Sequence, residues 1–99
     1  MQTENLIDIN AFCIDHNIEI SFISSLKQTG LIEITTIKET EFINTEQLQQ
    51  LEKFIRFYYE LDINLEGIET INHLLNRIGS LHDEILVLKN KLRFYEANE

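Results

Sequence analysis

Apolar positions near the N-terminus recur at helical spacing. Ile9, Phe12 and Cys13 lie three and four residues from one another, which places them on one face of a helix predicted over residues 8–17. Asp8 stands at its start, where a short carboxylate side chain can accept bonds from free backbone N–H groups. The pattern therefore predicts a short amphipathic helix with an N-cap.

A second helix is predicted directly after the first. Asn17 is a residue type that tolerates a left-handed turn, and Gly30 suits the position just beyond a helix C-terminus. Between them, the predicted helix Ile20–Thr29 carries three apolar residues at intervals of three: Ile20, Ile23 and Leu26. Two short helices joined by a tight turn form a helix-turn-helix.

The pattern then changes to runs of β-branched residues. Leu31–Ile37 and Thr40–Ile43 flank Lys38-Glu39, which predicts a small hairpin, or wing. A third helix is expected from Thr45 to near Leu61, with one apolar stripe made of Leu48, Leu51, Ile55 and Tyr58. The second half of this helix is apolar nearly all round, because Phe54, Phe57, Tyr59 and Leu61 lie off the stripe.

The clearest pattern is the heptad repeat of the C-terminal third. Asn64 caps a predicted fourth helix whose apolar residues alternate at spacings of three and four, namely Ile71, Leu74, Ile78, Leu81, Ile85, Leu88, Leu92 and Tyr95. At 1.5 Å per residue this seam is about 36 Å long, too long for a small head to cover. We expect homodimerisation along it, although the helix folding back on its own head is an alternative. Gly79-Ser80 is the weak point, and the unbroken heptad phase favours one continuous helix.

Charge and length limit the possible functions. The chain has 99 residues and a net charge of −9. We expect a winged helix-turn-helix head over residues 1–62 and a dimerisation helix over 63–99. The head carries 4 basic against 11 acidic residues, which argues against nucleic acid and favours a basic protein surface as the partner. The lone cysteine and the absence of a signal-peptide pattern or a long apolar run predict a cytoplasmic protein without a membrane segment.

The sequence offers no set of catalytic or metal-binding residues. Cys13 and His16 are spaced to share a helix face, but a closed zinc site needs four ligands and no second pair supplies them. Phosphate-binding glycine loops, calcium loops and nucleophile elbows are absent from the sequence. We therefore expect a non-enzymatic protein without a metal or cofactor.

The order of elements resembles the MerR superfamily. The phrases that carry the likeness are Thr29-Gly30-Leu31-Ile32 and the run from Leu61 to Ile68 (LDINLEGI). Members that regulate transcription place an arginine and aromatic residues in the middle of the second helix to grip the DNA backbone. The positions here are Ser24, Ser25 and Leu26, so the residues that grip DNA are missing.

A narrower likeness is to the CbpM-like chaperone modulators of this superfamily. The residues that carry it are Ile9 to Cys13, Gly30 to Glu33, Glu60-Leu61-Asp62, Gly67-Ile68 and the heptad tail. The resemblance implies binding to the J domain of a DnaJ-like co-chaperone, CbpA, so that it cannot stimulate the Hsp70 chaperone DnaK. We expect the contact at the end of the third helix and the start of the fourth, on Tyr58, Tyr59, Glu60, Asp62, Glu66 and Glu69.

Two other functions are compatible with the sequence. A MerR-like DNA-binding regulator would use the second helix and the wing, with Glu19, Ser21, Ser24, Ser25, Lys27 and Gln28 facing the groove. This set contains a single lysine, which is too few basic side chains to anchor DNA phosphates as typical DNA-binding proteins do. A coiled-coil adaptor for another protein is the third possibility.

Overall fold

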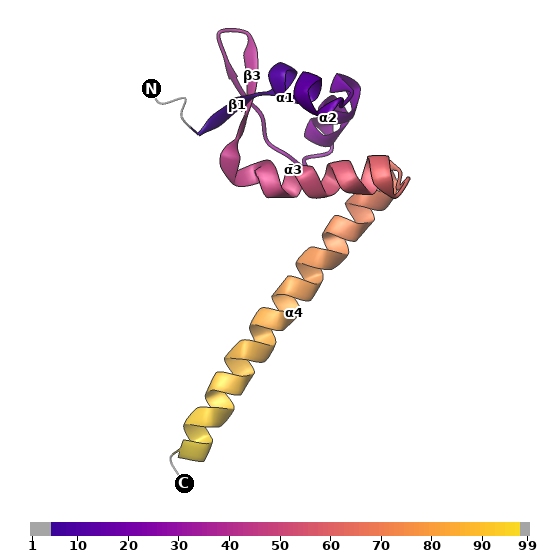
Figure 1. Ribbon diagram of the computed structural model, residues 1–99. Helices are drawn as coiled ribbons and strands as arrows, with labels where there is room; N and C mark the ends of the chain where they lie inside the picture. Colours follow the sequence, from indigo (N-terminus) through magenta and orange to yellow (C-terminus); the bar gives the residue numbers. More distant parts are fainter. Residues whose placement is uncertain (1–4, 98–99) are drawn as a thin grey trace. The chain divides into compact units, whose positions relative to one another are not determined.

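The computed structural model describes residues 5–97, so the outermost residues of the expected head and tail, 1–4 and 98–99, lie outside the described part. By its contacts the chain divides into two compact units, Met1–Glu69 and Thr70–Glu99. The described part is mainly helical, with a small sheet and a long C-terminal helix, as predicted (Figure 1). Whether residues 1–62 form a head by themselves stays a prediction.

The predicted helix-turn-helix is present in the first unit. Helix α1 spans Ile9–His16, and the carboxylate of Asp8 accepts bonds from the backbone N–H groups of Asn10 (2.9 Å) and Ala11 (3.3 Å), which confirms the predicted cap. Asn17 adopts the left-handed conformation with φ 59° and ψ 47°. This residue turns the chain into α2, which spans Ile20–Gln28.

The buried face of α2 differs from the predicted one. Ile23 and Leu26 are buried, but Ile20 is exposed and Phe22 takes its place in the core. The reason is that the aromatic ring of Phe22 packs against the end of the third helix, a contact that spacing alone does not reveal. Gly30 follows α2 with φ 79°, which confirms the predicted left-handed glycine.

A three-stranded antiparallel sheet contains the wing. Strands β2 (Thr35–Ile37) and β3 (Thr40–Asn44) pair around Lys38 and Glu39, whose φ values of 49° and 67° give a two-residue turn of the primed kind. The predicted hairpin is confirmed. Strand β1 (Leu6–Asp8) pairs with β3 on its other side, giving the order β1-β3-β2. Three residues are too few to show an alternating pattern, so the sequence did not reveal β1.

The first predicted strand of the wing is shorter than expected. Residues 31–34 form no strand, because the side-chain amide of Gln47 takes both backbone groups of Glu33: its Oε1 accepts from the N–H at 2.8 Å and its Nε2 donates to the C=O at 2.9 Å. The adjacent Ile32 is buried in the core. The side chain of Gln47 thus forms the hydrogen bonds that a neighbouring strand would form in the β-sheet predicted from the β-branched residues.

The third helix has three parts. A 3-10 turn, η1 (Thr45–Gln47), leads into α3 (Leu48–Ile55), and a π-helical segment, η2 (Arg56–Glu60), ends the run. The core of the first unit joins α3 and Phe57 of η2 to α1, α2 and β3. Its fully buried side chains are Phe54, Leu26, Ile43, Leu51 and Ile68.

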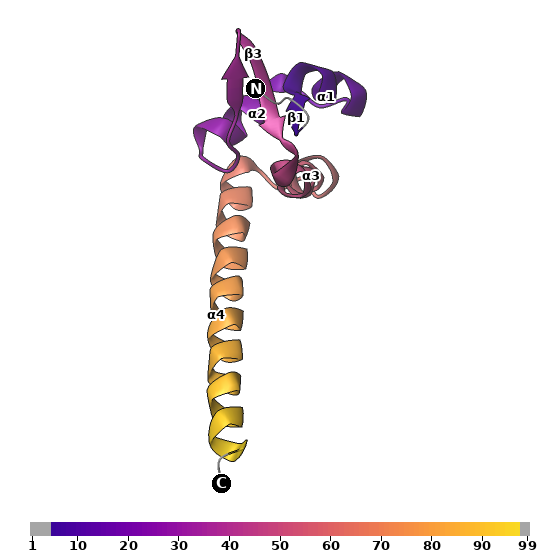
Figure 2. The same ribbon diagram turned by 90° about the vertical axis from the view of Figure 1, so that its left-hand side faces the viewer.

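Helix α4 spans Leu65–Ala97 without interruption, so Gly79 does not break it (Figure 2). Asn64 precedes it, and its side-chain oxygen accepts from the N–H of Gly67 at 2.8 Å, which confirms the predicted cap. A Cβ atom at Gly67 would lie 2.7 Å from Cγ2 of Ile63, so any larger residue here would have to displace the Ile63 side chain. Ile68, one residue later, fixes the first turn of α4 in the core. Within residues 5–97, no helix is both long and apolar enough to cross a bilayer.

Candidate protein-binding surface

The π-helical segment η2 presents two neighbouring tyrosines to α2. Its wider turn is closed by the N–H of Leu61, which donates to the carbonyl of Arg56 at 3.2 Å. Short π-helical segments of this kind often occur at functional sites. Here the segment places Tyr58 and Tyr59 side by side, with ring centroids 5.0 Å apart in an edge-to-face arrangement.

Phe22 of α2 is the common partner of both tyrosines. Its ring stacks on Tyr58 with centroids 4.3 Å apart, and Tyr59 meets its edge at 5.7 Å. The hydroxyl oxygen of Tyr59 also accepts the backbone N–H of Glu19 at 3.0 Å, just before α2 begins. Both tyrosines nevertheless keep nearly two-fifths of their surface exposed, so they serve as packing residues and as surface residues.

Tyr59 lies where three surface depressions meet. The first separates α1 from α3, the second lies at the corner between α1 and α2, and the third lies over the turn that follows η2 and also includes Tyr58, Asp62 and Asn64. We call this region the Tyr59 surface. An exposed aromatic centre within concave surroundings is typical of protein-binding sites.

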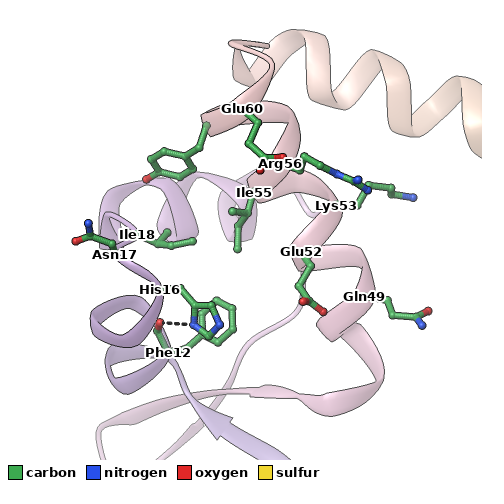
Figure 3. Close-up of a pocket in the computed structure, with 11 residues that line it drawn as sticks. Phe12, His16, Asn17, Ile18, Gln49, Glu52, Lys53, Ile55, Arg56 and Glu60 are labelled. Atoms are coloured by element: carbon green, nitrogen blue, oxygen red, sulfur yellow. Dashed lines mark hydrogen bonds between the residues drawn. The ribbon is translucent and has the colours of Figure 1, made fainter.

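The depression between α1 and α3 is the largest of these three, at about 690 Å³ (Figure 3). Phe12 and His16 stack with centroids 4.1 Å apart, and His16 Nδ1 lies 3.1 Å from the carbonyl oxygen of Phe12. Because a carbonyl only accepts, Nδ1 must carry the proton, which leaves Nε2 available. Figure 3 shows the side chains of Lys53 and Arg56 directed outward from this depression, away from His16.

The structure brings together some of the predicted partner-binding residues. All six are exposed. Tyr58, Tyr59 and Asp62 line one depression, and Glu60 joins Tyr59 in another. Asp62 has φ 54°, so its carboxylate is carried by a left-handed turn. Glu66 and Glu69 lie in the first turns of α4 and line none of these three depressions.

The heptad seam of α4 is exposed in the single chain. Seven of its residues keep between 41% and 69% of their surface accessible, namely Leu74, Ile78, Leu81, Ile85, Leu88, Leu92 and Tyr95, whereas Ile71 is half-buried. Leu75, Leu86, Val87 and Phe94 add exposed apolar surface outside the seam. Such a long apolar stripe on an exposed helix is typical of a self-association surface.

The α2 face that would read DNA carries little positive charge. Lys27 is the one basic residue of α2, and its Nζ lies 3.1 Å from Oε2 of Glu41 on the wing. Ser24 is exposed and Ser25 is half-buried, but Leu26 is fully buried. Leu26, one of the three positions at which DNA-binding members of the superfamily carry residues that contact the DNA backbone, therefore belongs to the core.

Cys13 and His16 have different surroundings in the fold. Cys13 is buried, and burial raises the pKa of its thiol, so it is a poor nucleophile and a poor metal ligand. His16 is instead bonded to Phe12. Among residues 5–97, no three His, Cys, Asp or Glu side chains are grouped so that they could hold a metal ion.

Sequence reasoning missed the apolar part of the Tyr59 surface. Ile14 and Ile20 are 80% and 44% exposed, and both line the corner depression with Tyr59. A signal was present for Ile14, because it lies off the apolar face that Ile9, Phe12 and Cys13 define. The exposed isoleucine becomes informative only in the fold, where it lines one depression together with Ile20 and Tyr59.

The comparisons with known proteins agree with this fold. The family model described as MerR HTH family regulatory protein matches residues 7–90. The match covers most of the chain, both the winged helix-turn-helix and most of α4, and the chain therefore belongs to this family. Comparison with the curated proteins and with the solved structures gave no significant match.

Proposed function

We propose that this protein is a non-catalytic chaperone modulator that binds the J domain of a DnaJ-like co-chaperone. By occupying the J domain it prevents stimulation of the Hsp70 partner, in the manner that its resemblance to the CbpM-like modulators implies. It works in the cytoplasm, stoichiometrically and without a cofactor. Within the MerR family, this protein would therefore bind another protein instead of DNA.

The observation that carries the proposal is the ion pair between Lys27 and Glu41. A helix-turn-helix protein that binds DNA anchors the phosphates with several basic side chains, because neutralised phosphates supply most of the affinity. Here the single lysine of α2 is already bound to a carboxylate at 3.1 Å. DNA binding through this face would require breaking that pair without another cation on α2 to help.

The Tyr59 surface supplies what a basic protein surface would recognise. Its exposed aromatic rings lie beside Glu60 and Asp62, and Glu66 and Glu69 follow on α4. Charge complementarity around an apolar centre steers association and selects the partner. J domains present a basic helical surface to Hsp70, so an acidic competitor with an aromatic centre suits that target.

Homodimerisation through α4 is part of the proposal. The exposed apolar seam from Leu74 to Tyr95 can pack against the same seam of a second copy of the chain. The charged residues that flank the seam can then form ion pairs between the two helices. A dimer would present two Tyr59 surfaces, so one J domain per protomer is the expected stoichiometry.

The family match favours a second candidate function, a MerR-like transcriptional regulator. Calorimetric titration with the isolated J domain, and in parallel with a DNA duplex, separates the two. Saturable binding to the J domain and suppression of its stimulation of Hsp70 ATP hydrolysis support the modulator. Salt-dependent binding to DNA alone would replace it with the regulator.

Charge variants test the contact itself. Glu60→Lys and Asp62→Asn should each weaken J-domain binding, and asparagine is chosen because it tolerates the left-handed backbone at position 62. Glu33→Lys is the matched control, since Glu33 is exposed, lines none of the three depressions and bonds to Gln47 through its backbone. If Glu60→Lys and Asp62→Asn bind the J domain with the wild-type affinity, as Glu33→Lys should, then Glu60 and Asp62 do not belong to the site.

A further inference from the structure

The corner depression between α1 and α2 exposes apolar side chains without a covering element. Ile14 and Ile20 lie on its walls, and Tyr59 joins them from the π-helical segment η2. Its volume is about 620 Å³, which is room for more than one side chain. Because exposing large apolar side chains wastes the free energy of their burial, this pair indicates a surface that is covered in a complex.

The walls of this corner notch, as we name the depression, are held in place by two hydrogen bonds. The N–H of Ile18 donates to the carbonyl of Cys13 at 2.9 Å across the left-handed turn at Asn17. On the opposite wall, the bond from Glu19 N–H to the Tyr59 hydroxyl fixes the start of α2 against η2. A preformed notch binds a partner with little loss of conformational entropy.

The charges around the corner notch select the partner. Glu19 lines the notch and Asp15 follows Ile14 on α1, whereas no lysine or arginine occurs in the sequence before Lys27. The basic residues Lys53, Arg56 and His16 line the adjoining depression between α1 and α3 and not the corner notch. An acidic corner repels nucleic-acid phosphates and anionic lipid and attracts a basic protein segment.

We infer that the corner notch receives the apolar ridge of a basic amphipathic helix, with Ile14 and Ile20 contacting the ridge and Asp15 and Glu19 facing its lysines and arginines. Two apolar residues one helical turn apart on the partner would fill the notch. The inference rests on the proposed function, because it assigns the helix to the J domain. It extends the contact beyond the acids near Glu60 to the helix-turn-helix itself, with Tyr59 bordering both parts.

The test uses the full-length protein and the isolated J domain in calorimetry. Ile14→Gln and Ile20→Gln should each weaken binding roughly tenfold, since each removes an apolar contact worth about 1.4 kcal/mol or more at the centre of the interface. Glutamine is a good helix former, so thermal unfolding should change little. Ile14→Leu should retain the wild-type affinity, and Ile37→Gln at the tip of the wing is the control for the same chemical change.

Each outcome has a separate meaning. Loss of affinity in Ile14→Gln and Ile20→Gln but not in Ile14→Leu or Ile37→Gln establishes the corner notch. Wild-type affinity in both glutamine variants, with the wild-type protein binding the J domain, overturns the notch and leaves the proposed function standing. Failure of the wild-type protein to bind the J domain overturns the proposed function and this inference with it.

Discussion

The hydroxyl of Tyr59 links the end of the third helix to the start of α2, so we expect Tyr59→Phe to destabilise the first unit. The substitution removes the acceptor 3.0 Å from the N–H of Glu19 and leaves the ring contacts with Phe22 and Tyr58 in place. A hydrogen bond contributes a net 0.5–1.5 kcal/mol as an order of magnitude. Because this one is exposed and water can replace the hydroxyl, we expect about 0.5–1 kcal/mol.

The corresponding fall in Tm is about 2–8 °C, since 1 kcal/mol shifts the midpoint of a domain of this size by about 4–8 °C. Tyr59→Ala should cost more, because two edge-to-face ring pairs worth about 0.5–1.5 kcal/mol each are also lost. Thermal unfolding followed by circular dichroism measures both, at one fixed protomer concentration so that any dimer contributes equally.

Hydrogen exchange at the backbone amide of Glu19 tests directly whether the Tyr59 hydroxyl holds the two helices together. In Tyr59→Phe the amide of Glu19 should exchange with solvent faster, whereas in Tyr58→Phe, which keeps the stack on Phe22, it should exchange at the wild-type rate. Unchanged exchange of the Glu19 amide in Tyr59→Phe, together with an unchanged Tm, would mean that the hydroxyl does not hold the two helices together.

Three further outcomes are expected. Ile85→Glu places a charge in the middle of the exposed seam and should convert a dimer into monomers in sedimentation velocity, whereas Thr36→Glu on the wing should not; identical sedimentation of both variants would remove the seam from the interface. Burial raises the pKa of the Cys13 thiol above its ordinary value of 9.0, so iodoacetamide should modify the folded protein far more slowly than the unfolded chain at neutral pH. Since the unfolded thiol loses its proton first, stability should also fall as pH rises above 9.0, and a Tm that is flat through that range in wild type and Cys13→Ala alike would contradict this.

The sequence determined the elements whose causes are local. Asp8, Asn17 and Asn64 each act within a few residues of their own positions, so the ends of α1 and the start of α4 were predictable. The heptad repeat likewise favoured one continuous helix through Gly79, and α4 is continuous there, because a periodic apolar pattern over many turns outweighs one weak helix former.

Tertiary contacts decided what the sequence could not. Strand β1 exists because β3 offers it an edge, and residues 31–34 form no strand because Gln47, fourteen positions away from Glu33, takes the backbone groups of that residue. The predicted tyrosines and acids do lie on the surface, but spacing along one helix could not show that Tyr59 meets Glu19 forty positions away. The corner notch depends on that meeting, because Ile14, Ile20 and Tyr59 come from three different segments that only the packed fold brings together.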